Sequence, residues 1–147
     1  MRPVSVKNAD GSQVNLHNEK YLEFLRSENR PDQLLLEAWN CIEFNIDQLV
    51  TRQFGVNCEY FDNKVQFLVN SGFGRKLELL KKLNILDLNE YQTIHKFQEE
   101  RNKFFHTLCL RKLDSSNLSE IEQKMDDWVS VGKLSFDILR RPALPEH

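Results

Sequence analysis

The sequence predicts an all-α fold, an up-and-down bundle of four main helices with a short N-terminal extension. Three observations favour this fold. Apolar residues recur every three to four positions over long segments. Glycine and proline are scarce, five and four in 147 residues, which disfavours a loop-rich or all-β chain. Short polar segments with helix-capping signals separate the periodic stretches. The length fits one domain with a substantial core.

We expect three parts along the chain: an extension over residues 1–30, a helical bundle over 31–141 and a tail over 142–147. In the extension, Asp10-Gly11 is a turn signal between weakly alternating flanks, which allows a hairpin within residues 4–16. The segment "NEKYLEFLRSE" predicts a short helix after it. Pro31 then interrupts the chain.

The first main helix is predicted from Asp32 to Phe54, before a stop at Gly55. Spacings of three and four residues relate Leu35, Trp39, Ile42, Ile46, Leu49 and Gln53, all of which are apolar except Gln53. Leu36, Phe44 and Val50 widen the apolar surface beyond one stripe. This width predicts contacts on two sides, either with the bundle and a partner subunit or with the N-terminal segment.

The remaining helices follow from periodicity and caps. Residues 55–72 fit a strand or a buried helical turn equally well, and "GFGRKLELLKKLNIL" predicts the second helix. Asp87 and Glu90 form a capping box that starts a third helix over residues 88–112. Asn117 and Glu120 form another box and start the fourth helix. Gly132, on the apolar face of that helix, predicts a close helix–helix approach.

Bulk properties exclude several classes of protein. The net charge of −2 gives no general affinity for nucleic acid, so any basic surface must be local. Three cysteines without a CxxC pair disfavour a disulfide framework, and no cysteine–histidine spacing matches a zinc site. The first thirty residues lack an apolar signal core, and no window reaches membrane-spanning length. We expect a cytoplasmic protein without membrane segment, metal or cofactor.

One charged residue interrupts an apolar stripe in the third helix. In "EERNKFFHTL", a helical wheel places Arg101 in the middle of a stripe formed by Ile94, Phe97, Phe104, Phe105 and Leu108. Asn102 and His106 are four residues apart and share a neighbouring face. A charge at a core position is costly unless it is paired or has a task.

Arg101, Asn102 and His106 fit the pattern R-N-x-x-x-H, for which structural and chemical readings both exist. In the structural reading, Arg101 pairs with a buried carboxylate or caps another helix. Asn102 and His106 then form an ordinary hydrogen-bonded pair. In the chemical reading, the planar guanidinium holds a phosphate and the imidazole moves protons near neutral pH. Arginine and histidine at this spacing lie about 140° apart around a helix, so one copy cannot direct both at the same atom.

The segment 74–106 resembles the core of a HEPN domain, especially the branch related to mannitol operon repressors. The resemblance rests on the connector "LNILD" and on "RNKFFH". It implies a helical domain that dimerises and, in many members, a metal-independent endoribonuclease with its site at the dimer interface. Carried onto this chain, the site residues are Arg101, Asn102 and His106. The chain departs from the family in having the bulky Phe105 where a small residue often precedes the histidine.

The resemblance therefore implies a homodimer that cleaves RNA, in a toxin–antitoxin or phage-defence setting, with a nucleotidyltransferase-type antitoxin as a partner. A second hypothesis is a non-catalytic helical protein-binding regulator similar to mannitol operon repressors. A third is a structural all-α dimer in which the R-N-x-x-x-H residues only organise the interface.

Overall fold

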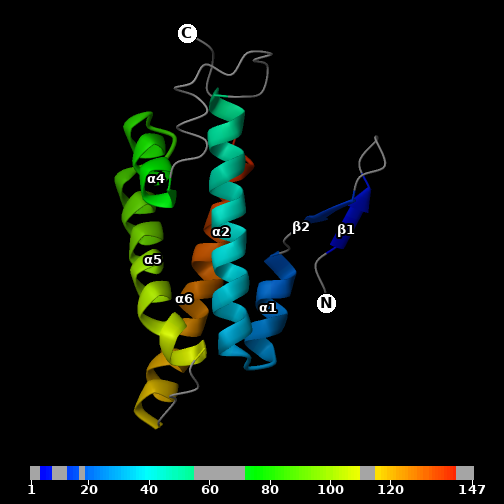
Figure 1. The fold of residues 1–147 in the computed structure, drawn as a ribbon, viewed down its shortest axis with the longest axis vertical. Coiled ribbons are helices and arrows are strands. Elements are labelled where there is room, and N and C mark those ends of the chain that lie inside the picture. The colour runs from blue at the N-terminus through cyan, green and yellow to red at the C-terminus, as the bar shows by residue number, and fades with distance from the viewer. Residues whose placement is uncertain (1–3, 8–12, 17–18, 55–71, 110–114, 142–147) are drawn as a thin grey trace.

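The computed structural model describes residues 4–7, 13–16, 19–54, 72–109 and 115–141. These residues are mostly helical, as predicted, and they include a small hairpin of strands β1 (Val4–Lys7) and β2 (Gln13–Leu16). The strands pair antiparallel, with Val4 opposite Leu16 and Lys7 opposite Gln13. The helices are α1 (Glu19–Ser27), α2 (Pro31–Phe54), α4 (Phe73–Lys82), α5 (Leu88–Cys109) and α6 (Ser115–Leu139). Figure 1 shows the helices side by side and the hairpin outside them.

Helix α2 lies at the centre of the helical body and packs against α1, α4, α5 and α6. This arrangement accounts for the wide apolar surface predicted from the sequence, because each neighbour covers a different part of α2. One of these neighbours, α1, belongs to the N-terminal segment that the sequence offered as a candidate. Leu36 is an exception among the apolar residues of α2, since it stays 50% exposed.

The up-and-down order of the four main helices is not confirmed. In such an order the first and last helices run antiparallel, but α2 and α6 run parallel (Figure 1). Two hydrogen bonds agree with the parallel direction, because the later residue of α2 bonds to the later residue of α6. Asn45 Nδ2 donates to Ser135 Oγ at 2.9 Å, and Arg52 Nη1 donates to the Leu139 carbonyl at 2.8 Å. Hydrophobic periodicity identifies a helix and its buried face, but it carries no information about direction.

The close approach predicted at Gly132 is confirmed. A Cβ atom built on Gly132 would lie 2.5 Å from Leu22 Cδ1 and 3.9 Å from the Ala38 Cβ atom. Leu22 and Ala38 are fully buried. Helices α1, α2 and α6 therefore meet at this position because α6 has no side chain there.

The capping box predicted before α5 is also confirmed. The Asp87 N–H donates to Glu90 Oε1 at 3.0 Å, and the Glu90 N–H donates to Asp87 Oδ1 at 2.7 Å. The predicted start of the last helix was wrong by a few residues: α6 begins at Ser115, so Asn117 lies in its first turn instead of at its cap. Helix α5 ends at Cys109, and residues 110–112 of the predicted third helix lie outside the described residues.

None of the helices in the described ranges is long and apolar enough to cross a membrane. Three predicted features fall outside these ranges. They are the hairpin turn in residues 8–12, the strand or buried helical turn in residues 55–71, and the tail over residues 142–147.

Candidate functional site at Arg101

The apolar stripe of α5 faces the core. Ile94, Phe97 and Phe104 are 0–2% exposed. Arg101 lies one turn after Phe97 and is half-buried, as is Phe105. Arg101 is therefore a partly buried arginine between buried side chains of the stripe, at the boundary between α5 and α2.

Aromatic rings surround the Arg101 guanidinium. Its Cζ atom lies 4.8 Å from the centre of the Trp39 ring and 5.0 Å from the centre of the Phe105 ring. Trp39 in turn packs against Phe73, at a centroid distance of 4.7 Å, and Phe97, at 6.5 Å. Cation–π contacts of this kind stabilise a charge beside an apolar surface without neutralising it.

The guanidinium keeps hydrogen-bonding capacity. Nη1 donates to Asn102 Oδ1 at 3.0 Å. No carboxylate within the described ranges lies at ion-pair distance from Arg101. Among the described residues, therefore, no buried carboxylate neutralises Arg101. A guanidinium carries five N–H groups in a planar fork, so Nε and Nη2 are left for a ligand.

Asn102 is exposed, and its side-chain oxygen is occupied by Arg101. His106 lies on α5, one turn further along, but its side chain falls outside the described part of the chain. The structure thus brings Arg101 and Asn102 together, whereas the relation of either residue to the imidazole stays a prediction.

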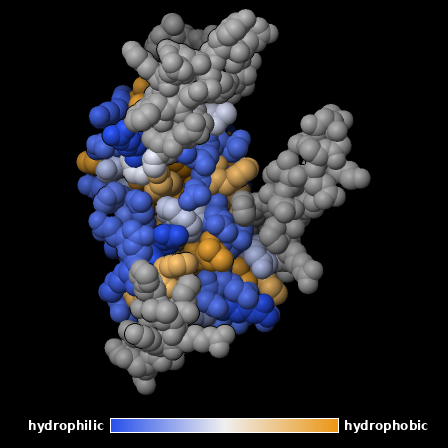
Figure 2. Space-filling model, viewed as in Figure 1, coloured by the Kyte–Doolittle hydropathy of each residue, from blue (hydrophilic) through white to orange (hydrophobic). Residues whose placement is uncertain are grey.

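Helix α2, which carries Trp39, also carries an exposed apolar residue. Leu36, one turn before Trp39 on α2, is half exposed. We call the set Trp39, Arg101, Asn102 and Phe105 the Arg101 face. In the view of Figure 2, hydrophobic side chains lie among the hydrophilic side chains over the helices. The face combines a cation with two aromatic rings.

Sequence reasoning missed the role of Trp39. The tryptophan was assigned to the apolar repeat of α2, and it is indeed only 8% exposed. Nothing in the sequence links it to Arg101, which lies on another helix. The helical wheel of α5 did place Phe105 beside Arg101, but it gave no reason to expect stacking of ring and guanidinium.

A concave surface lies between α5 and α6. A cavity of about 270 Å³ is lined there by Phe97, Glu100 and Trp128, among others. Glu100 accepts hydrogen bonds from Lys124 Nζ at 2.9 Å and from the Trp128 indole N–H at 3.2 Å. The hydrogen bond to Glu100 also raises the pKa of Lys124. Glu100 and Lys124 satisfy each other, so they do not form a charged binding site.

Within the described ranges, no group of three or more histidine, cysteine, aspartate or glutamate side chains is placed to hold a metal ion. Comparison of the chain with protein-family profiles, with curated proteins and with solved structures finds no significant match.

Proposed function

We propose that the protein is a metal-independent endoribonuclease of the HEPN type, whose site is completed by a second copy of the chain. The observation that carries this proposal is the Arg101 guanidinium, held half-exposed by Trp39 and Phe105 with N–H groups left for a ligand. The motif RNKFFH and the helical fold support the same assignment.

In the proposed reaction, Arg101 donates N–H groups to the non-bridging oxygens of the scissile phosphate and stabilises the charge that develops on them. The ribose 2′-oxygen attacks phosphorus and loses its proton, while the bond from phosphorus to the 5′-oxygen breaks and that oxygen gains a proton. Histidine titrates near neutral pH, so His106 suits either proton transfer. The products are a 2′,3′-cyclic phosphate and a 5′-hydroxyl, and DNA is not a substrate because it lacks the 2′-hydroxyl.

A second copy solves a geometric problem of the single helix. Arg101 and His106 are five residues apart, which separates them by about 140° around α5 and by about 7.5 Å along it. With two copies related by a twofold axis, the arginine of one chain acts with the histidine of the other. The exposed Leu36 on α2 and the partly buried Phe105 on α5 supply apolar area for such a contact.

RNA cleavage in EDTA tests the proposal. Wild-type protein is expected to cut RNA and to leave cyclic-phosphate ends, and both Arg101→Ala and His106→Ala are expected to lose this activity while remaining folded. Matched controls are Arg30→Ala, an exposed arginine between α1 and α2, and His95→Ala on α5 itself. The nuclease proposal is rejected if the wild-type protein leaves a broad set of RNAs intact, or if Arg101→Ala cleaves RNA as well as the wild type.

The family resemblance also suggests the setting. We place the nuclease in a toxin–antitoxin or phage-defence system, restrained by a nucleotidyltransferase-type antitoxin. Growth arrest on expression of the wild type, relieved by His106→Ala, is the expected sign of such a toxin.

One observation favours a non-catalytic regulator as the second candidate. Tryptophan, arginine and phenylalanine are the residue types enriched at the centres of protein interfaces, and all three lie on the Arg101 face. This candidate predicts that RNA stays intact and that Arg101→Ala weakens binding of a protein partner instead.

A further inference from the structure

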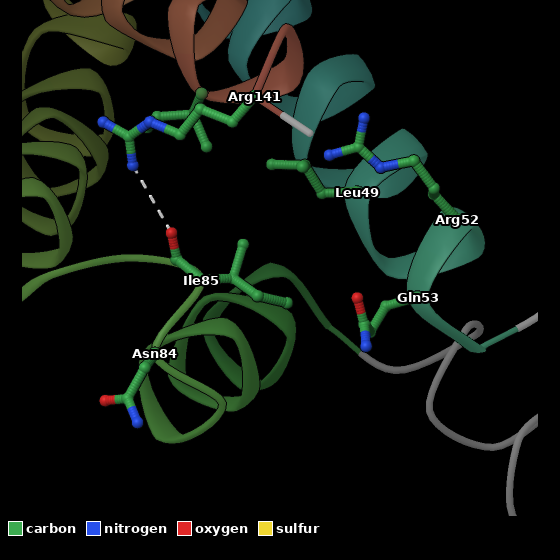
Figure 3. Close-up of a pocket in the computed structure, with 7 residues that line it drawn as sticks. Leu49, Arg52, Gln53, Asn84, Ile85 and Arg141 are labelled. Carbon is green, nitrogen blue, oxygen red and sulfur yellow. Dashed lines mark hydrogen bonds between the residues drawn. The ribbon is translucent and has the colours of Figure 1, made fainter. Parts of the chain in front are cut away.

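A small cavity lies near the first turn of α5, whereas Arg101 lies in the second half of that helix. Its volume is about 160 Å³, and its walls come from the last turns of α2 and α6 and from the turn between α4 and α5. In Figure 3, the Leu49 and Ile85 side chains point toward this space, whereas the Asn84 side chain points away from it.

The floor of the cavity is apolar. Leu49 is 2% exposed and Ile138 is fully buried. Ile85 is partly buried and closes one side. Apolar cavities of about 150 Å³ hold a molecule of the size of benzene, so this floor has room for one compact apolar group.

Arg141 brings a charge to the rim, but that charge is already neutralised. Both of its terminal nitrogens donate to the carboxylate of Glu90, and Nη1 also lies 3.5 Å from the Ile85 carbonyl (Figure 3). Glu90 is 5% exposed. Arg141 and Glu90 thus form a neutral pair that closes one side of the cavity.

Arg52 brings a second charge, which is not neutralised in the same way. Its Nη1 donates to the Leu139 carbonyl at the end of α6. No carboxylate in the described ranges lies at ion-pair distance from its guanidinium. The carbonyl end of a helix carries only about half a negative charge, so the described residues leave a net positive charge at the mouth of the cavity. The neighbouring Gln53 adds an amide to the rim.

We propose that this cavity binds a small anion with a compact apolar body. The anionic head, a carboxylate or a phosphate, lies against Arg52 and the Gln53 amide, and the apolar body fills the space between Leu49, Ile85 and Ile138. Apolar pockets with a few convergent polar groups are the usual form of small-ligand sites. The proposal does not depend on RNA cleavage, because none of these residues belongs to the Arg101 face.

Benzoate and phenyl phosphate are suitable probes for the full-length chain, with titration followed by calorimetry or by ligand-observed NMR. We expect saturable binding of at least one of them, and the preferred probe identifies the head group. Benzamide has the same body without the charge, and inorganic phosphate has the charge without the body. Both are expected to bind at least about tenfold more weakly, benzamide because it loses the charged hydrogen bonds and inorganic phosphate because it buries no apolar surface.

Two variants locate the site. Arg52→Gln keeps an amide donor for the Leu139 carbonyl but removes the charge, and it is expected to weaken binding at least about tenfold. Ile85→Phe fills part of the cavity and is expected to block binding without unfolding the chain, since Ile85 is only partly buried. Arg30→Gln is the matched control and is expected to bind like the wild type. Absence of binding by both probes, equal affinity in Arg52→Gln, or equal affinity for inorganic phosphate overturns the proposal.

Discussion

At the scale of single residues, Arg101 shows how a charge is accommodated on an apolar stripe. The sequence identified the anomaly, because the helical wheel of α5 depends only on local spacing. The solution was not predictable, since Trp39 comes from α2 and its ring reaches Arg101 only after the helices pack. The chain tolerates the charge through rings and partial exposure, which leaves the guanidinium accessible.

Replacing Arg101 by leucine separates its roles. Because no described carboxylate depends on Arg101, we expect Arg101→Leu to change the free energy of unfolding by less than about 1 kcal/mol, the size of an exposed cation–π contact. RNA cleavage is expected to disappear. Urea unfolding followed by circular dichroism measures the first effect. A loss of several kcal/mol would show instead that Arg101 is a structural residue.

Glu90 has one role that the sequence revealed and one that it did not. The capping box with Asp87 was predictable because its two residues lie within one turn. The hydrogen bonds from Arg141 were not, since that arginine follows the last helix. Together these contacts tie the start of α5 to the end of α6.

Glu90 also makes stability depend on pH. The hydrogen bond from Arg141 holds the pKa of the Glu90 carboxyl below its usual value. A lowered pKa in the folded state means that the contribution of Glu90 is fully present above the unfolded pKa of about 4.3 and is lost as the pH falls below it.

The variant Glu90→Gln tests this dependence. We expect it to be less stable than the wild type by about 1–2 kcal/mol at pH 7, because Arg141 is half exposed and regains water when its partner is lost. The difference is expected to shrink below about pH 4. Thermal unfolding at several pH values measures it, and a difference that stays constant down to acid pH would contradict this account.

At the scale of helices, Gly132 sets the distance between α6 and its neighbours. We expect Gly132→Ala to destabilise the protein by about 1–3 kcal/mol, the usual cost of overpacking a tight core, although alanine is the better helix former. The reason is that Leu22 must move from a fully buried position. Urea unfolding compares the variant with Ser130→Ala, which changes an exposed residue of the same helix. Equal stability of Gly132→Ala and the wild type would show that Leu22 relocates freely.

At the scale of the whole molecule, the sequence predicted most helices but not how they are oriented. Periodic apolar residues identify α2, α5 and α6, and the capping box of Asp87 and Glu90 identifies the start of α5, because these signals are local. The parallel alignment of α2 and α6 depends on pairs such as Asn45 with Ser135, which meet only in the folded chain. The same limit applies to the candidate site, whose partner residues lie on different helices.

The central claim is that two copies complete one site, and mixing two inactive variants tests it most directly. Arg101→Ala retains the histidine and His106→Ala retains the arginine, so a mixed dimer regains one of its two arginine–histidine pairs. Random mixing makes half of the dimers mixed, and we expect about one quarter of the wild-type RNA cleavage to return. If native mass spectrometry detects mixed dimers but the mixture stays as inactive as each variant alone, the composite site is wrong.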